Sequence, residues 1–127
     1  MKSLFTKEED KKKKKKLIFA IDFDGTIVSN SFPKIGEPNK KMIEFIKKIK
    51  ENGDQWILYT CRDGKYLQEA LDFLETLGIK PDKANEDILD FEGKSKSCKP
   101  FANIYIDDRN AGGLVIPDVY QNQNQGD

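Results

Sequence analysis

The sequence predicts an α/β fold with a small parallel sheet. Three mainly apolar segments of four or five residues alternate with two amphipathic segments of helical length. Unbroken apolar runs are typical of strands covered on both faces, and strand–helix–strand alternation is typical of parallel sheets with right-handed connections. A chain of 127 residues is long enough for one domain with its own core and too short for two.

Each element is indicated by its own local pattern. Strands are expected at residues 17–21 (LIFAI), 56–59 (WILY) and 103–106 (NIYI), with a weaker one at 83–85. Helices are expected at residues 38–52 and 63–77, where apolar side chains recur on one face and a glycine follows the last turn.

The two ends of the chain differ in composition from the middle. Residues 1–16 hold eight lysines and three acidic residues, and residues 117–127 are polar, so we expect a disordered lysine-rich tail, a folded domain over 17–116 and a polar C-terminal tail. Without the first tail the chain carries 14 basic and 19 acidic residues, a net charge of about −5. Nucleic acid is therefore a candidate partner only through the lysine tail.

Composition excludes several kinds of chemistry. The chain has no histidine, which removes Ser-His-Asp and Cys-His triads and histidine-bound zinc. Its two cysteines, Cys61 and Cys98, are far apart and are expected to be reduced thiols in a cytoplasmic protein. No apolar run is long enough for a membrane span, so no membrane partner is expected.

Polar residues follow each strong strand at its carboxyl end. They are Asp22, Asp24, Thr60, Asp107 and Asp108. Parallel strands present their carboxyl ends at one edge of the sheet, where ligands of α/β proteins bind. Several ionised carboxylates can share that edge only with a cation, and oxygen ligands without histidine favour Mg²⁺. A magnesium site that accepts phosphate is therefore expected, with Lys99 as a further cation.

The same segments carry a family resemblance. DFDGTIV, then LYTCR, then Lys99, then IYIDDRNAGG resembles the four-part signature of the haloacid dehalogenase-like (HAD) hydrolases over residues 17–113. The residues of these motifs are similar to those of the short, capless bacterial and phage members of the superfamily. The resemblance implies a three-layer, Rossmann-like (HAD-like) domain with no full cap, and a Mg²⁺-dependent phosphomonoester hydrolase (phosphatase).

The resemblance also implies catalytic roles. Asp22 would attack phosphorus and become an aspartyl phosphate, and Asp24 would be general acid and then general base. Gly25 would let the backbone turn so that amides point at the phosphoryl oxygens, while Thr60 and Lys99 would bind the phosphoryl group.

The metal ligands implied by the resemblance come from both ends of the domain. They are the carboxylate of Asp22, the backbone carbonyl of Asp24 and the carboxylate of Asp107. Asp108 is either a supporting acid or the ligand in place of Asp107.

Other charged residues keep two interpretations. Lys94 or Lys96 could serve in place of the lysine at the third motif. Arg62 and Arg109 each follow a motif, and either could clamp a phosphate or the leaving group, or form a salt bridge to the acidic edge.

The resemblance does not specify the substrate, because members of the superfamily usually select it with a cap domain and neither gap between the motifs has room for one. The loop at residues 28–38 is the candidate lid, and residues 85–97 could form another wall. Two alternative functions remain: a nucleotide or polynucleotide-end phosphatase, and a non-catalytic module of the same fold that binds Mg²⁺ or phosphate.

Overall fold

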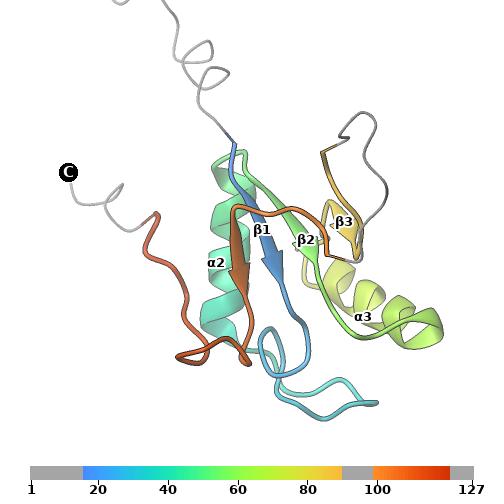
Figure 1. The fold of residues 1–127 in the computed structure, drawn as a ribbon. Coiled ribbons are helices and arrows are strands. Elements are labelled where there is room, and N and C mark those ends of the chain that lie inside the picture. Colours follow the sequence, from blue (N-terminus) through green and yellow to red (C-terminus); the bar gives the residue numbers. More distant parts are fainter. Residues whose placement is uncertain (1–15, 90–98, 121–127) are drawn as a thin grey trace, which may run out of the picture.

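A four-stranded parallel sheet with two helices forms the described part of the protein, residues 16–89 and 99–120 of a computed structural model (Figure 1). The elements are β1 (Ile18–Ile21), α2 (Lys40–Glu51), β2 (Gln55–Leu58), α3 (Gly64–Thr76), β3 (Lys83–Ala84) and β4 (Ile104–Ile106). The strand order is β3-β2-β1-β4, and every neighbouring pair is parallel. The expected α/β fold with a small parallel sheet is confirmed.

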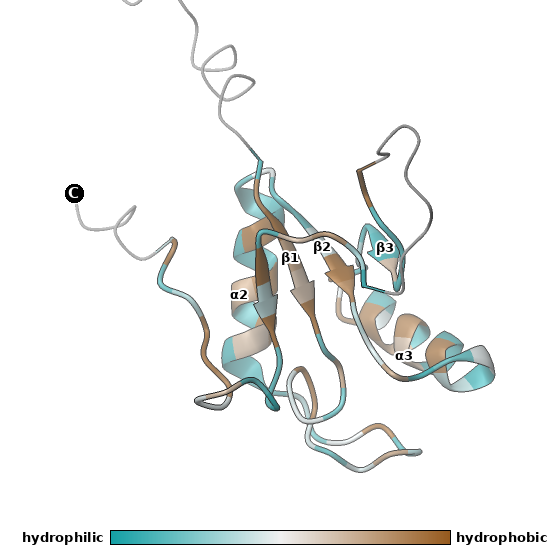
Figure 2. Ribbon diagram, in the orientation of Figure 1, coloured by the Kyte–Doolittle hydropathy of each residue, from teal (hydrophilic) through white to brown (hydrophobic). Residues whose placement is uncertain are grey.

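Both helices pack on the same face of the sheet. Alternate residues of β1, Phe19 and Ile21, point into the larger apolar cluster. That cluster also contains the buried stripe of α2, including Phe45 and Ile49, and that of α3, including Leu74. In Figure 2 brown apolar stretches alternate with teal polar ones along both helices, as expected of helices with one buried face.

The opposite face of the sheet has a smaller apolar cluster. It comprises Ile18, Ala20, Ile57 and Ala102, with Tyr59, Ile88 and Tyr105 packed against it. Within residues 16–89 and 99–120 no helix covers this face, and the segment that leads into β4 crosses it (Figure 1). The expected three-layer arrangement is therefore wrong for the described residues. β2 and β3 follow β1 in one direction across the sheet, so crossovers of the same hand place both helices on one side.

The expected boundary at residue 117 is also wrong. Tyr120 is 5% exposed, and its ring lies 6.2 Å from that of Phe19 and 5.6 Å from that of Phe45. Its hydroxyl donates to the carboxylate of Asp54, which also accepts the backbone N–H of Leu17 at 2.9 Å. Burial and this hydrogen bond raise the pKa of the Tyr120 phenol well above its usual value. The chain thus belongs to the folded domain as far as Tyr120, while residues 1–15 and 121–127 lie outside the described part.

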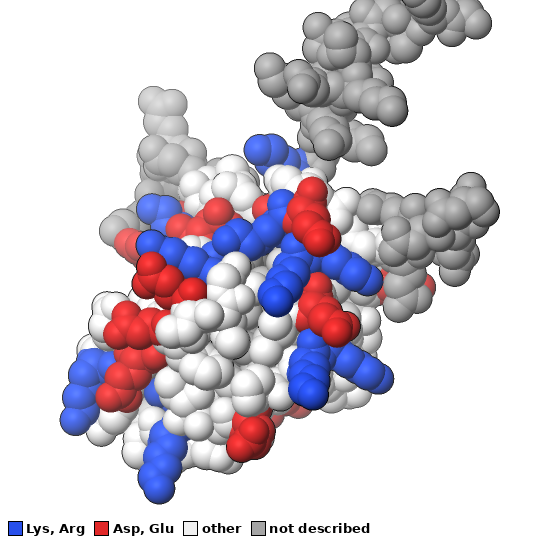
Figure 3. Space-filling model, turned by 180° about the vertical axis from the view of Figure 1, so that it is seen from behind, with Lys and Arg blue, Asp and Glu red and all other residues white. Residues whose placement is uncertain are grey.

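The helix side of the molecule carries lysines and acidic residues side by side rather than one broad basic field (Figure 3). Among the described residues, no helix is long and apolar enough to cross a membrane.

Candidate functional site

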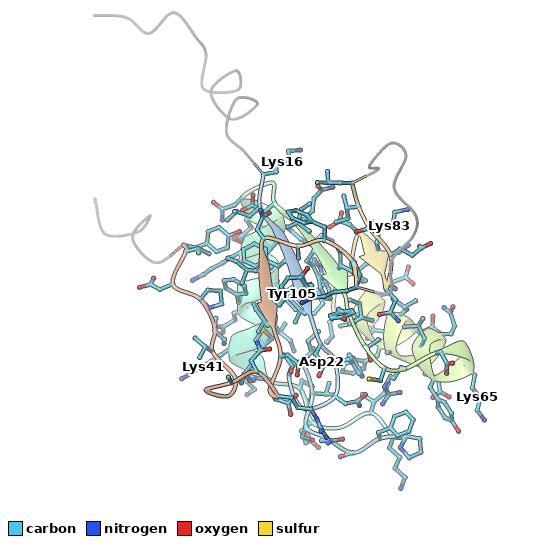
Figure 4. All side chains as sticks on the ribbon, in the orientation of Figure 1. Lys16, Asp22, Lys41, Lys65, Lys83 and Tyr105 are labelled. Atoms are coloured by element: carbon cyan, nitrogen blue, oxygen red, sulfur yellow. The ribbon has the colours of Figure 1, made fainter. Side chains whose placement is uncertain are left out.

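Three aspartates from opposite ends of the domain converge at the carboxyl edge of the sheet. Asp22 follows β1, and Asp107 and Asp108 follow β4, which is the neighbour of β1. The backbone N–H of Asp22 donates to the carbonyl of Ile106 at 3.0 Å, which extends the pairing of the two strands to the site. One carboxylate oxygen from each aspartate lies within 4.8 Å of the others. Figure 4 labels Asp22 at this edge.

The crowding changes the acidity of Asp22. Burial, followed by the negative charge of Asp107, raises its pKa from 3.8 to about 7, with smaller contributions from Asp108 and Asp24. Three carboxylates within one small volume repel one another unless a cation lies among them. The donor set is all oxygen and half-buried, which fits a hard divalent ion such as Mg²⁺ better than a soft metal.

Thr26 joins the two halves of this cluster. It is 1% exposed, and its hydroxyl accepts the backbone N–H of Asp108 at 3.0 Å. The same hydroxyl lies 3.4 Å from Oδ2 of Asp22 and 3.5 Å from Oδ1 of Asp108, so its proton can be donated to either. Sequence reasoning gave Thr26 no role, although its place in the first motif was a signal that could have identified it.

Gly25 is required by both backbone conformation and space. Its φ is +88°, a region that residues with a Cβ rarely adopt, and a Cβ there would lie 2.7 Å from Cγ of Asp108. Its N–H donates to the carbonyl of Val28 at 2.7 Å, which closes the turn after β1. The turn therefore lets the first motif approach the end of β4 closely enough to form the aspartate cluster.

Asp24 points away from the cluster and is paired with Arg62. Nε of Arg62 lies 2.8 Å from one carboxylate oxygen of Asp24, and Nη2 lies 2.8 Å from the other. The side chains of Arg62 and Asp24 are 1% and 16% exposed. Of the two interpretations of Arg62, the salt bridge is the one observed. A role for the Asp24 carbonyl as a metal ligand stays a prediction.

Arg62 also fastens the neighbouring segments. Nη2 donates to the carbonyl of Lys34 at 3.0 Å, and Nη1 donates to the carbonyl of Tyr66 at 3.2 Å. Its guanidinium carbon lies 5.0 Å from the ring centroids of both Phe23 and Phe32. The hydrogen bonds to Asp24 raise the pKa of Arg62 above its already high value. Arg62 thus connects the first motif, the loop at 28–38 and the start of α3.

Thr60 lies just beyond β2, at the same edge as Asp22. Its backbone N–H donates to Oδ1 of Asn85 at 2.9 Å, and its hydroxyl oxygen accepts the N–H of Arg62 at 3.1 Å. The hydroxyl proton still has to be donated, so it is available for an anion. Asn85, which has φ +54°, was expected as part of a possible wall at 85–97, and its hydrogen bond to Thr60 was not predicted. It is the described part of the wall expected at 85–97, together with the residues up to Leu89.

The remaining candidate residues are Lys99, Arg109, Lys94, Lys96 and the two cysteines. The ammonium of Lys99 lies 4.5 Å from the ring centroid of Tyr105, and its contact with a bound phosphate stays a prediction. Lys94, Lys96 and Cys98 lie outside the described residues, while Cys61 is an exposed free thiol. Arg109 donates its backbone N–H to Oδ1 of Asp107 at 2.9 Å.

One solved structure resembles the whole domain. It is the structure of the conserved protein coded by a locus from Bacteroides thetaiotaomicron, with 34% identity and a TM-score of 0.73 over 89% of this chain and 93% of that chain. This chain belongs to the family of that conserved protein. A scan against protein-family models gave no match, and a search of curated proteins gave none either.

In this member of the family the loop at residues 28–38 has the position expected of a lid. It follows the turn after β1 and lies beyond the carboxyl ends of the strands, near the start of α3 (Figure 1). It is held at its base because Ser29 N–H donates to the carbonyl of Glu37 at 2.8 Å, and at its tip by Arg62. The site is thus an open edge with one anchored loop beside it.

Proposed function

We propose that the protein is a Mg²⁺-dependent phosphomonoester hydrolase of the HAD-like superfamily. The observation that carries the proposal is the convergence of Asp22 with Asp107 and Asp108 at the carboxyl edge of a parallel sheet. The order of the motifs, from DFDGT through LYTCR to IYIDD, supports the family assignment.

Asp22 is the proposed nucleophile. Its carboxylate oxygen forms a bond to phosphorus while the bond from phosphorus to the leaving-group oxygen breaks, which yields an aspartyl phosphate. A water molecule then attacks that phosphorus, and inorganic phosphate leaves with the electron pair returning to the Asp22 carboxylate. Bound Mg²⁺ would neutralise the carboxylates and the phosphate oxygens. Asp107 and Asp108 are the residues that would hold it beside Asp22.

The proton transfers need a second carboxyl group, and Asp24 is the candidate. It would protonate the leaving-group oxygen in the first step and take a proton from water in the second. Both of its oxygens accept hydrogen bonds from Arg62 in this structure, which leaves the second lone pair of each oxygen for the proton that is transferred. The hydroxyl of Thr60 and the ammonium of Lys99 are proposed to bind the phosphoryl oxygens.

The test is turnover of a chromogenic aryl phosphate with Mg²⁺ and with chelator. We expect turnover to need Mg²⁺ and to be lost in Asp22→Asn, because an amide is a poor nucleophile. Asp118→Asn is the matched control, since Asp118 is an exposed acid. Full activity in Asp22→Asn would remove Asp22 from the role of nucleophile, and unchanged rates in Asp24→Asn would remove Asp24 from proton transfer.

A non-catalytic module is the second candidate, and the pairing of Arg62 with Asp24 favours it, because both carboxylate oxygens of Asp24 are engaged by Arg62 rather than directed to a substrate. This candidate predicts thermal stabilisation by Mg²⁺ and vanadate without turnover of any phosphate in a broad panel. Turnover that depends on Asp22 would reject it.

A further inference from the structure

An exposed aromatic pair lies beside Asp24. Phe32, at the tip of the loop at 28–38, is 52% exposed. Its ring centroid lies 5.3 Å from that of Tyr66 in the first turn of α3, with the ring planes at 62°. The guanidinium of Arg62 packs on the Phe32 ring, which leaves the rest of that ring towards solvent.

The aromatic pair lies on the side of Asp24 towards which the leaving group of the substrate would extend. In the proposed reaction Asp24 protonates the leaving-group oxygen, so the organic part of the substrate must lie on the Asp24 side of the phosphorus. Arg62 links that side to the aromatic pair, because it bonds to Asp24 at 2.8 Å and lies 5.0 Å from the centroid of Phe32. A leaving group that extends beyond the acid would therefore meet the two rings.

Resting on the proposed function, we propose that Phe32 and Tyr66 form an aromatic shelf that stacks against a flat ring in the leaving group. Stacking of a base on an aromatic side chain stabilises binding and needs no particular hydrogen-bonding pattern. The substrate class is then phosphomonoesters with an aromatic ring close to the phosphate, such as nucleoside monophosphates, in preference to plain sugar phosphates.

Charge near the shelf suits an anionic substrate. The ammonium of Lys65 lies 5.1 Å from the Tyr66 ring, at the start of α3 as Figure 4 shows, and Lys34 is exposed in the same loop as Phe32. Two cations at the approach offset the repulsion between a phosphate and the aspartate cluster, which favours encounter with phosphorylated ligands.

The experiment compares kcat/KM for adenosine monophosphate with kcat/KM for ribose 5-phosphate, with the phosphate in the same position on both. We expect the first to be the larger. Phe32→Leu keeps an apolar side chain in the loop but removes the ring, and should lower the ratio about tenfold, the equivalent of roughly 1.4 kcal/mol. Phe32→Tyr should retain the ratio. Phe101→Leu is the matched control because Phe101 is exposed, at 39%, and precedes β4 at the other end of the strand.

The outcomes separate the shelf from the hydrolase. Equal kcat/KM for the two substrates, or an unchanged ratio in Phe32→Leu, would overturn the shelf while leaving the hydrolase intact. If the aryl phosphate is turned over but neither of these compounds is, the hydrolase stands and the shelf is overturned. If none of the three is turned over, the hydrolase fails and the shelf is judged by calorimetry with Mg²⁺ present. Tighter binding of adenosine monophosphate than of ribose 5-phosphate, lost in Phe32→Leu, would then support the shelf, and equal binding would overturn it.

Discussion

Arg62 holds both carboxylate oxygens of Asp24 at 2.8 Å, in a site where only 1% of the arginine side chain is exposed. This arrangement separates Asp24 from the aspartate cluster that its neighbour Asp22 joins. The first motif therefore sends its two acids to different partners: one towards the expected metal position and one into an ion pair.

Removal of one member of the ion pair should destabilise the protein strongly. Removing one partner of a buried pair leaves an unpaired charge and costs about 3–5 kcal/mol. We expect Arg62→Ala to lower the free energy of unfolding in urea by this amount, and the double variant with Asp24→Ala to lose less than the sum of the two single variants. Arg109→Ala, at an exposed position, should stay within about 0.5 kcal/mol of wild type. Additive single effects would contradict the coupling.

Gly25 gives a test of the geometry of the aspartate cluster. An alanine there meets a positive φ, which costs about 1–2 kcal/mol, and its Cβ also pushes against Asp108. Gly53→Ala is the matched control, because its φ is +74° with nothing within 4 Å of the added Cβ. We expect Gly25→Ala to lose more stability than Gly53→Ala, because only its Cβ meets a neighbour, and only Gly25→Ala should weaken Mg²⁺ binding, by about tenfold or more in a calorimetric titration. Equal Mg²⁺ affinity in the two variants would show that Asp108 does not depend on Gly25.

The acidity of Asp22 predicts a pH effect on the metal-free protein. Its pKa is raised from 3.8 to about 7, so between these values the folded protein binds a proton that the unfolded chain does not. The contribution of Asp22 to the free energy of unfolding is therefore complete below pH 3.8 and is lost as the pH rises through about 7. In chelator, thermal unfolding should show Asp22→Asn to be more stable than wild type at pH 8, and by a clearly smaller margin at pH 5.

Magnesium should make wild type more stable than Asp22→Asn at high pH, the reverse of the order in chelator. Because the ion binds the ionised carboxylate, it should raise the midpoint of thermal unfolding of wild type more at pH 8 than at pH 5, where protons compete. Asp118→Asn should respond to Mg²⁺ as wild type does. An identical pH profile for wild type and Asp22→Asn in chelator would contradict the crowding of Asp22.

Tyr120 gives a test of where the domain ends. Tyr120→Phe keeps the packing on Phe19 and Phe45 but removes the hydrogen bond to Asp54, and should cost about 1–3 kcal/mol in urea unfolding because a polar group loses its partner. Tyr120→Ala should cost about 3–5 kcal/mol. Val119→Ala, at a side chain 37% exposed, should change stability little. Wild-type stability in Tyr120→Ala would mean that this segment does not stabilise the domain.

The strands and the aspartate cluster could be predicted because their physical signals are local. Unbroken apolar runs marked β1, β2 and β4, and the rule that parallel strands end at one edge placed Asp22 near Asp107. The weak strand at 83–85 was also correct in kind and position, and it is β3.

The rest depended on contacts that a single sequence does not specify. Tyr120 is one aromatic residue in a polar stretch, so composition hid its place in the core. Arg62 could pair with any acid at the edge, and only the fold directs it to Asp24. The bridging role of Thr26 needs the end of β4, which lies 82 positions later in the chain. The third layer was expected from the unbroken apolar run of the first strand and from the family resemblance, and the described residues do not contain it.

β4 is an outermost strand of three residues that pairs only with β1 among the described strands. Two of the three clustered aspartates follow it directly, so an ion gripped by the cluster would also hold the border of the sheet in place. Binding of the ion and pairing of β4 with β1 are then thermodynamically linked. Amide hydrogen exchange at Asp22, whose N–H donates to the carbonyl of Ile106, would slow as the ion concentration rises. The exchange rate of this one amide would therefore report the fraction of protein that has bound the ion.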